Sequence, residues 1–286
     1  FDGLKGDVVP SILRQFSAPV KLTPASGEEN LEDLAFLAAR DTDGFNKWDA
    51  GQKLYTVAIF EQMAAEMSTT TYNYVKEAFG RTLQDETSTD FSIISYALML
   101  PSEGTLQELI DGVVDPIAIK KARGTLKKAL AREFRSELQK RYDDLTKAME
   151  GDEFKVDADS IGRRRLRNVC LDYLCSIKET AEEQKNAAAL AMVHFESATG
   201  MTDRMAALSC LASMDGEGAS ARDKALKTFY DDANGDALVL NKWFTVQAMA
   251  DLPDVLDRVK ELTKHPDFTM KNPNRCRSLL GAFTMN

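Results

Sequence analysis

The stretch Asp159-Ser-Ile-Gly-Arg-Arg-Arg-Leu-Arg-Asn-Val-Cys-Leu-Asp-Tyr-Leu174 predicts the fold class. Within it and just beyond, apolar residues recur at the spacing of one helix face, and these are Leu166, Val169, Cys170, Tyr173, Leu174 and Ile177. A helix with such a continuous apolar stripe is stable only when a neighbouring element covers it. We therefore expect an amphipathic helix that forms part of a larger helical core.

Similar apolar stripes occur on both sides of this stretch. They lie near residues 31–38, 50–58, 71–80, 90–100, 105–110, 116–149, 187–196, 203–214, 221–231, 238–250 and 253–263. The links between them are short and polar, and consecutive amphipathic helices with short links favour antiparallel pairs stacked into a superhelix. We predict an armadillo- or HEAT-like solenoid, although no sequence repeat of about 40 residues is visible.

The first 24 residues have a different pattern. Val8–Leu13 and Ser17–Leu22 are short, rich in β-branched residues and punctuated by prolines, as strands or extended edges are. Two strands alone do not make a stable sheet. We therefore interpret residues 1–24 as the end of a β-sandwich domain and residues 25–286 as the helical domain. The first helix of this domain follows a capping-box spacing at Ser26–Glu29.

The last predicted helix lies in the stretch Lys271–Phe283. Asn272 can cap its first amide groups, and Pro273 fits the first helical position. An apolar stripe then follows at Cys276, Leu279, Leu280 and Phe283. Arg277 is turned roughly 100° away from Cys276 and lies off that stripe. It is either a surface cation or a residue directed at a ligand.

Composition excludes several classes of protein. The chain has 286 residues, of which 44% are hydrophobic and 28% charged, as in a soluble globular protein. Its net charge of −9 disfavours a general nucleic-acid binder, and no apolar run is long enough to span a membrane. Because the chain begins at Phe1 and ends within a helical pattern, we interpret it as a piece of a longer protein, truncated near its C-terminal end.

No catalytic or metal-binding motif is present in the sequence. The two histidines, His194 and His265, lack the spacing of zinc ligands, and we interpret them as a partly buried helix residue and a loop residue. The four cysteines lie in helical apolar patterns without a CxxC pair, so we expect buried free thiols in an intracellular, reducing compartment. We predict no catalytic residue, no metal ligand and no cofactor in this chain.

One basic stretch stands out in the acidic chain. Residues 120–141 carry nine Lys or Arg against two Glu. Such a bias suggests an anionic partner, and the alternative is a solvated helix face paired with acidic neighbours. Salt-sensitive retention of the protein on a polyanion resin would favour the anionic partner.

Several stretches, taken in order, resemble the C-terminal part of the bacterial-type aminopeptidase N family, the zinc-dependent alanyl aminopeptidases. The stretches that carry the resemblance are Pro10–Arg14, Phe16–Leu22, Phe45–Ala50, Leu100–Glu103, Ile161–Leu174, Met201–Leu208, Asn241–Phe244 with Gln247 and Ala248, and Asn272–Phe283. They span nearly the whole chain.

The resemblance implies a parent enzyme with zinc in a separate catalytic domain upstream of this chain. It implies that the helical superhelix closes over the active site and restricts the entry of peptides. It also implies that Arg277, the second arginine of the Asn-Pro-Asn-Arg-x-Arg stretch, projects into the chamber and contacts the substrate, while Arg275 has a structural role. The partners would be the catalytic domain of the same parent chain and the peptide substrate, with no nucleic acid and no membrane.

The alternative is a free-standing α-solenoid that binds a protein partner through its concave face. The coding sequence upstream of Phe1 discriminates the two. A His-Glu-x-x-His motif there would favour the aminopeptidase, and its absence would favour the interaction module.

Overall fold

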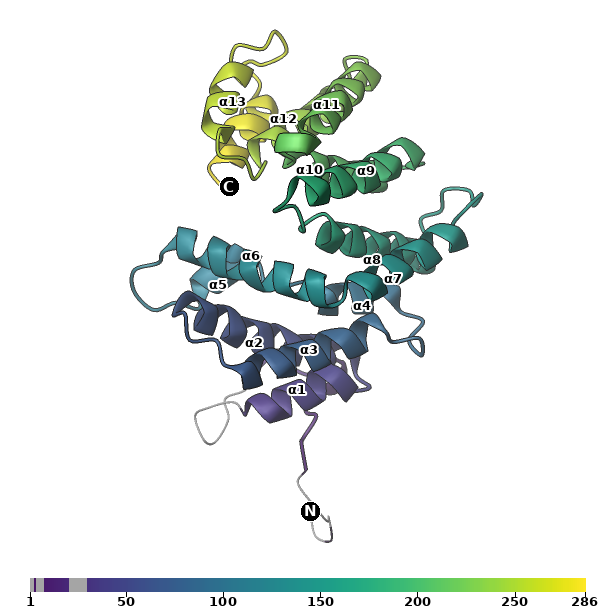
Figure 1. Ribbon diagram of the computed structural model, residues 1–286, viewed down its shortest axis with the longest axis vertical. Helices are drawn as coiled ribbons and strands as arrows, with labels where there is room; N and C mark the ends of the chain where they lie inside the picture. Colours follow the sequence, from purple (N-terminus) through teal and green to yellow (C-terminus); the bar gives the residue numbers. More distant parts are fainter. Residues whose placement is uncertain (1–2, 4–7, 21–29) are drawn as a thin grey trace. The chain divides into compact units, whose positions relative to one another are not determined.

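The structure is a computed structural model that describes residues 3, 8–20 and 30–286. Within these ranges the regular secondary structure is entirely helical, which confirms the mainly α fold class (Figure 1). The chain divides into two compact units, residues 1–173 and 174–286. In the described ranges, no helix is long and apolar enough to cross a membrane.

The first unit contains the helices up to α8. Their bounds are α1 Leu31–Arg40, α2 Gly44–Met63, α3 Thr69–Leu83, α4 Phe91–Leu98, α5 Glu103–Glu108, α6 Pro116–Glu133, α7 Arg135–Ala148 and α8 Ala158–Leu174, whose last residue begins the second unit. Helices α1, α2 and α3 pack against one another, and α2 also packs against α4 and α6.

The second unit continues the series. Its helices are α9 Ala181–Ser197, α10 Met201–Ala212, α11 Ala219–Ala233, α12 Ala237–Ala248, α13 Val255–Leu262 and α14 Pro273–Cys276, with the 3₁₀ turn η2 Gly216–Gly218 and the turn η3 Arg277–Gly281. Each of α9 to α12 packs against the next helix in the chain, and η3 packs mainly on α12.

Polar side chains cap most of the helix starts in the described chain. Ser102 accepts the amide of Thr105 at 3.0 Å directly after Pro101, and Thr180 forms a reciprocal capping box with Glu183. The capping box expected at Ser26–Glu29 lies outside the described residues. The helix that follows begins at Leu31 and is capped by Asn30.

The predicted stripe of α8 is confirmed as core. All six of its apolar residues, from Leu166 to Ile177, are buried. The hydroxyl of Tyr173 donates to the Leu98 carbonyl at 2.6 Å, which ties α8 to the end of α4. Gly162 allows the close approach of the same two helices, because a Cβ there would lie 3.0 Å from the Ser92 amide nitrogen.

The long amphipathic stretch 116–149 forms two helices that meet at Phe134 instead of one continuous helix. Leu126, Leu130 and Leu138 are fully buried as expected, but Phe134 leaves the helical conformation with φ −107° and ψ 25°. Its ring packs on Phe79 with centroids 5.3 Å apart and covers Gly80, where a Cβ would come within 2.7 Å of the ring. Tertiary packing therefore interrupts the helical pattern here.

The N-terminal segment contains no strand within residues 8–20. It makes the short 3₁₀ turn η1 Arg14–Phe16, which is tied to the start of α2. The Gln15 amide donates to Asp43 at 2.8 Å, and Asn46 donates to the Ile12 carbonyl at 2.9 Å. The proposed domain boundary near residue 24 lies outside the described residues and stays a prediction.

Candidate functional site

The candidate site is the C-terminal helix of the second unit, and its start follows the sequence prediction. The Asn272 side chain accepts the amides of Asn274 and Arg275 at 3.0 and 3.2 Å, and Pro273 occupies the first helical position. Helix α14 then covers Pro273–Cys276. The cap sets the direction of the chain that carries both arginines.

Arg275 is buried, with 5% of its surface exposed. Its guanidinium donates to Asn241 Oδ1 at 2.7 Å and to the Asp267 carbonyl at 2.9 Å, and it lies 5.0 Å from the centroid of the Phe244 ring. A third bond reaches the Ala237 carbonyl at 3.4 Å. These contacts bind α14 to the start of α12 and to the preceding loop, so Arg275 is a structural residue, as the sequence analysis proposes.

An aromatic cluster supports that loop. Trp243, Phe244, Tyr230 and His265 pack with ring centroids 5.0 to 5.7 Å apart. The Tyr230 hydroxyl donates to Asp267 Oδ2 at 2.5 Å, and this hydrogen bond raises the pKa of Tyr230 above its ordinary value. His265 is thus a packed loop residue, and its ring nitrogen Nδ1 accepts the Asp267 amide. The Asp267 carbonyl in turn accepts a hydrogen bond from Arg275.

The helix does not continue in regular α form after Cys276. Residues Arg277–Gly281 form the π-helical turn η3, in which the Ala282 amide bonds the Arg277 carbonyl five residues earlier. In an α-helix that amide would bond Ser278. The Ser278 carbonyl instead accepts the hydroxyl of Thr245, on α12, at 3.0 Å.

The π turn alters the predicted apolar stripe. Leu279 is fully buried, but Cys276, Leu280 and Phe283 are only half-buried. Ser278 is buried in addition, with its hydroxyl donating to the Arg275 carbonyl at 2.8 Å. The regular helix that the periodicity predicts is therefore wrong across these residues, because an α-helical spacing does not apply within a π turn.

Arg277 is exposed, in keeping with its predicted position off the stripe. In the part of the chain that the structure describes, its guanidinium has no hydrogen-bond or ion-pair partner. Arg275 and Arg277, two positions apart, thus differ fully in environment. One is bonded into the core, and the other presents an unpaired cation to solvent.

The basic stretch of residues 120–141 is largely accounted for by contacts within the first unit. Arg123 donates to the Pro101 carbonyl at 2.7 Å, and Arg141 donates to the carbonyls of Leu83 and Asp85. Lys127 pairs with Asp172 at 2.7 Å. Arg141 thus lies at the C-terminus of α3, where a cation is stabilising, while Arg123 bonds the loop before α5 and Lys127 pairs with a carboxylate. These contacts favour the paired face over an anionic partner.

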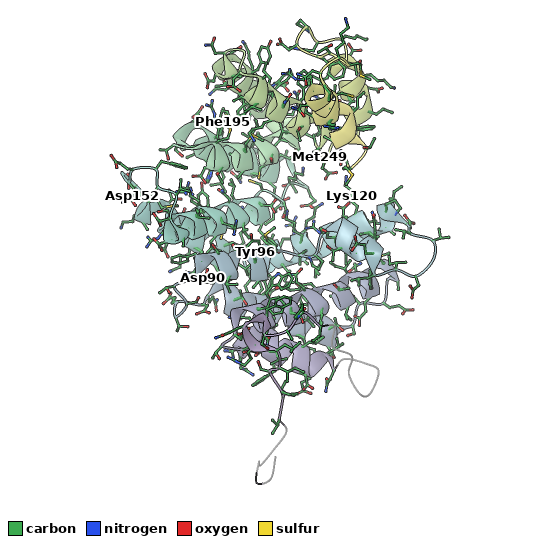
Figure 2. All side chains as sticks on the ribbon, turned by 180° about the vertical axis from the view of Figure 1, so that it is seen from behind. Asp90, Tyr96, Lys120, Asp152, Phe195 and Met249 are labelled. Carbon is green, nitrogen blue, oxygen red and sulfur yellow. The ribbon has the colours of Figure 1, made fainter. Side chains whose placement is uncertain are left out.

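The arginine run at the start of α8 is also engaged. Arg165 lies 4.4 Å from the centroid of the Tyr96 ring on α4, and Arg164 lies 4.6 Å from that of Phe154. Tyr96 is labelled in Figure 2. Arg163 pairs with Asp159 at 2.7 Å. Guanidinium groups stacked on rings contribute to packing, so this run has a structural explanation.

A hollow on the surface of the first unit is a second candidate site. Charged side chains of both signs line it, among them Arg40, Lys47, Arg81, Asp85 and Glu86. Burial raises the pKa of Asp85, but hydrogen bonds from Thr87 and Ser88 and the nearby Lys47 outweigh it and hold this pKa below its ordinary value. Lys47 and Asp85 are already paired with each other at 3.3 Å, so neither charge is left without a counter-charge for a ligand.

His194 and the four cysteines are the remaining candidate groups from the sequence. His194 is buried on α9, with 1% of its surface exposed, and is more deeply buried than the sequence suggests. Cys170 and Cys175 are buried free thiols, whereas Cys210 and Cys276 are only half-buried. Burial raises the pKa of Cys170 to about 12. Among the described residues, no three His, Cys, Asp or Glu side chains lie together as a metal site.

Comparison with known proteins defines the family. Residues 31–286 match the model described as "Domain of unknown function (DUF3458_C) ARM repeats". The chain belongs to this family. The match confirms the armadillo-like helical fold, and it covers nearly all of the predicted helical domain.

Individual relatives of this armadillo-repeat family member are aminopeptidases. The chain is 35% identical to aminopeptidase N of Escherichia coli (strain K12) over 286 residues and 35% identical to that of Caulobacter vibrioides over 288 residues. Aminopeptidase N of Haemophilus influenzae is 31% identical over 293 residues. In each case the alignment covers 99% of this chain but 31% of the relative, so the chain spans about a third of the length of these proteins.

A solved structure agrees with these relatives. The crystal structure of Legionella pneumophila aminopeptidase A in complex with aspartic acid matches with a TM-score of 0.78 and 30% sequence identity. The match covers 96% of this chain and 31% of that one. The resemblance to the C-terminal helical part of the aminopeptidase N enzymes is therefore confirmed.

Proposed function

We propose that this chain is the non-catalytic helical domain of a zinc metallo-aminopeptidase that releases N-terminal amino acids from peptides. In this role it encloses the active-site chamber and restricts the access of peptides. The observation that carries the proposal is the match of almost the whole chain to about a third of three aminopeptidases N. Its partners would be the catalytic domain of the same parent chain and the peptide substrate.

Zinc would be bound outside this chain. The side chains that hold catalytic zinc are histidines with a carboxylate or thiolate, and the described residues do not bring three such groups together. Both histidines are packed among other side chains. His194 is buried on α9, and His265 belongs to the aromatic cluster. The residues present therefore do not fit a zinc site, and we assign no chemical step to them.

Arg277 is our candidate for the substrate contact. An exposed guanidinium can hold a peptide carboxylate through two parallel hydrogen bonds, which orients the substrate without taking part in the chemistry. Two features support the assignment: Arg277 lacks a partner within the described chain, and Arg275, two positions earlier, fixes the segment that carries it.

We further propose that the protein works in a reducing, intracellular compartment. Four free cysteines fit such a compartment, because thiols stay reduced there.

Replacing Arg277 with alanine in the full-length enzyme tests this role. We expect KM for dipeptides with a free carboxylate to rise on the order of 10- to 100-fold, because a charge-assisted contact is lost. KM for chromogenic aminoacyl amides, which have no carboxylate, should change little. R258A is the matched control, since Arg258 is a cation of the same unit that pairs at 2.9 Å with Asp254, the residue before its own helix. An equal rise in KM for both substrate classes would mean that Arg277 acts only through packing and does not contact the substrate carboxylate.

The isolated chain provides a second test of the proposal. We expect the purified fragment neither to bind zinc nor to hydrolyse aminoacyl substrates, and we expect the full-length parent to do both. Zinc content by atomic absorption and hydrolysis with and without a chelator measure the two properties. Chelator-sensitive hydrolysis by the fragment alone would contradict the proposal.

A further inference from the structure

Residues 11–16 of the first unit form a short segment, here called the strap, that lies against the junction of α1 and α2. It contains the turn η1, and no residue of that turn is buried. Phe16 keeps 55% of its surface exposed, although its ring packs on that of Phe45 with centroids 5.0 Å apart. The hydrophobic effect therefore contributes little to holding the strap in place.

The backbone of the strap adopts an unfavourable conformation. Leu13, Gln15 and Phe16 have φ angles of 54°, 58° and 52°. This left-handed region is costly for residues with a Cβ, and none of the three is an Asn or Asp, which adopt it more readily. Such conformations persist only where surrounding contacts hold them. The strap must therefore be held by specific bonds to the rest of the unit.

Arg14 supplies the side-chain bonds. Its guanidinium donates to Asp41 Oδ1 at 2.9 Å and to the Thr42 hydroxyl at 2.8 Å, both in the loop between α1 and α2. It also donates to the Ser11 hydroxyl at 2.9 Å, within the strap. The Asp41 side chain is only 2% exposed, so water screens this ion pair less than a pair on the open surface. Arg14 is therefore the main side-chain anchor of the strap.

Asp43 is a second anchor. One of its carboxylate oxygens caps α2 by accepting the Asn46 amide at 3.0 Å, and the other accepts the Gln15 amide at 2.8 Å. Burial alone would raise the pKa of Asp43, but these amide hydrogen bonds and the charge of Arg14 outweigh it and lower this pKa. Asp43 is therefore ionised at neutral pH, where it accepts both amides.

We propose that the strap is releasable: residues 11–16 detach from the α1–α2 junction as a unit while the helices stay folded, and Arg14 holds the attached state against the unfavourable backbone. The bonds described above all reach residues 41–46, so breaking them leaves the packing of α1 on α2 intact. Segments with few buried apolar contacts open locally without global unfolding. The inference goes beyond the proposed function and does not depend on it.

Amide hydrogen exchange of the full chain tests this inference, with residues 11–17 compared with α1 and α2. In R14A we expect the strap amides, above all that of Gln15, to exchange faster on the order of 10- to 100-fold, because the hydrogen bonds of a charged group are lost. Exchange within α1 and α2 should stay unchanged. R40A is the matched control, since Arg40 pairs with Glu77 on α3 at 2.8 Å, and it should alter neither region.

A second variant acts in the opposite direction. Q15G keeps the backbone amide that donates to Asp43, and glycine adopts a positive φ without the steric cost. We therefore expect strap exchange in Q15G to slow by about three- to tenfold.

Four outcomes would overturn the inference. An unprotected Gln15 amide in the unmodified chain would mean that the attached strap does not form. Equal acceleration of the strap, α1 and α2 in R14A would mean that they unfold together. Unchanged strap exchange in R14A would mean that Arg14 does not hold it. Unchanged or faster strap exchange in Q15G would mean that the backbone conformation does not oppose attachment.

Discussion

Replacement of Arg275 with alanine is expected to lower the free energy of unfolding of the second unit by about 3 to 5 kcal/mol, because each buried acceptor left without its donor costs about 1 to 3 kcal/mol. The substitution leaves the acceptors on Asn241, Asp267 and Ala237 without their donor. It also removes the guanidinium from the face of the Phe244 ring. Lysine should not rescue the loss fully, because a single ammonium cannot reach all three acceptors in the guanidinium geometry.

The matched control for R275A is R277A, two positions further along at the start of η3. Because Arg277 is exposed and unpaired, its replacement should change stability by less than about 0.5 kcal/mol. The chain has two tryptophans, Trp48 in the first unit and Trp243 in the second. Urea unfolding followed by fluorescence in a W48F background therefore reports the second unit. Similar stabilities of R275A and R277A would contradict the structural role of Arg275.

Replacement of Phe79 with alanine should destabilise the first unit by about 3 to 5 kcal/mol, the usual cost of truncating a buried aromatic side chain. Phe79 is fully buried, and its ring packs against Tyr173 with centroids 5.1 Å apart. It also packs against Phe134, the residue at the junction of α6 and α7. The substitution would therefore create a cavity where three helices meet.

Two further variants control for F79A. F79L should cost less than half as much, because leucine refills part of the space. F36A removes the same ring from a half-exposed position on α1 and should have a much smaller effect. Urea unfolding followed by Trp48 fluorescence measures all three. A loss below about 1 kcal/mol for F79A would mean that the core around Phe79 can collapse into the space.

The helical fold could be predicted from the sequence because its signals are local and repeated. The stripe Leu166–Ile177 and the Asn272–Pro273 start each depend on residues within a few turns of one another. The predicted helices 203–214, 221–231 and 238–250 are confirmed as α10, α11 and α12 with ends shifted by a few residues. Such shifts are expected, because helix ends depend on caps and fraying.

What the sequence did not predict depends on contacts between distant residues. The break at Phe134 follows from Phe79 and Gly80, which lie more than fifty positions away. No apolar spacing in the stretch 116–149 indicates it, since Phe134 itself continues the stripe of Leu126, Leu130 and Leu138.

The candidate site also combines features that follow from local sequence with features that depend on distant residues. Its capping residues and the exposure of Arg277 follow from local sequence. Arg275 bonds Asn241 and Asp267, and the Ser278 carbonyl in the π turn accepts a hydrogen bond from Thr245, each from another part of the chain. The stretch Asn241–Phe244 contributes to the family resemblance, but the sequence gives no indication that Asn241 bonds Arg275.

The π turn also has a consequence for how related sequences align. A π turn contains one residue more than the α turn it replaces, so η3 is equivalent to a single-residue insertion in a helix. A relative without that residue could keep the bonds of Arg275 to α12 and of Asn286 to the Ala248 and Ala250 carbonyls, and close the helix in regular form. Gaps of one position between those two sites would therefore distinguish relatives that contain the π turn from relatives that continue the helix in regular α form.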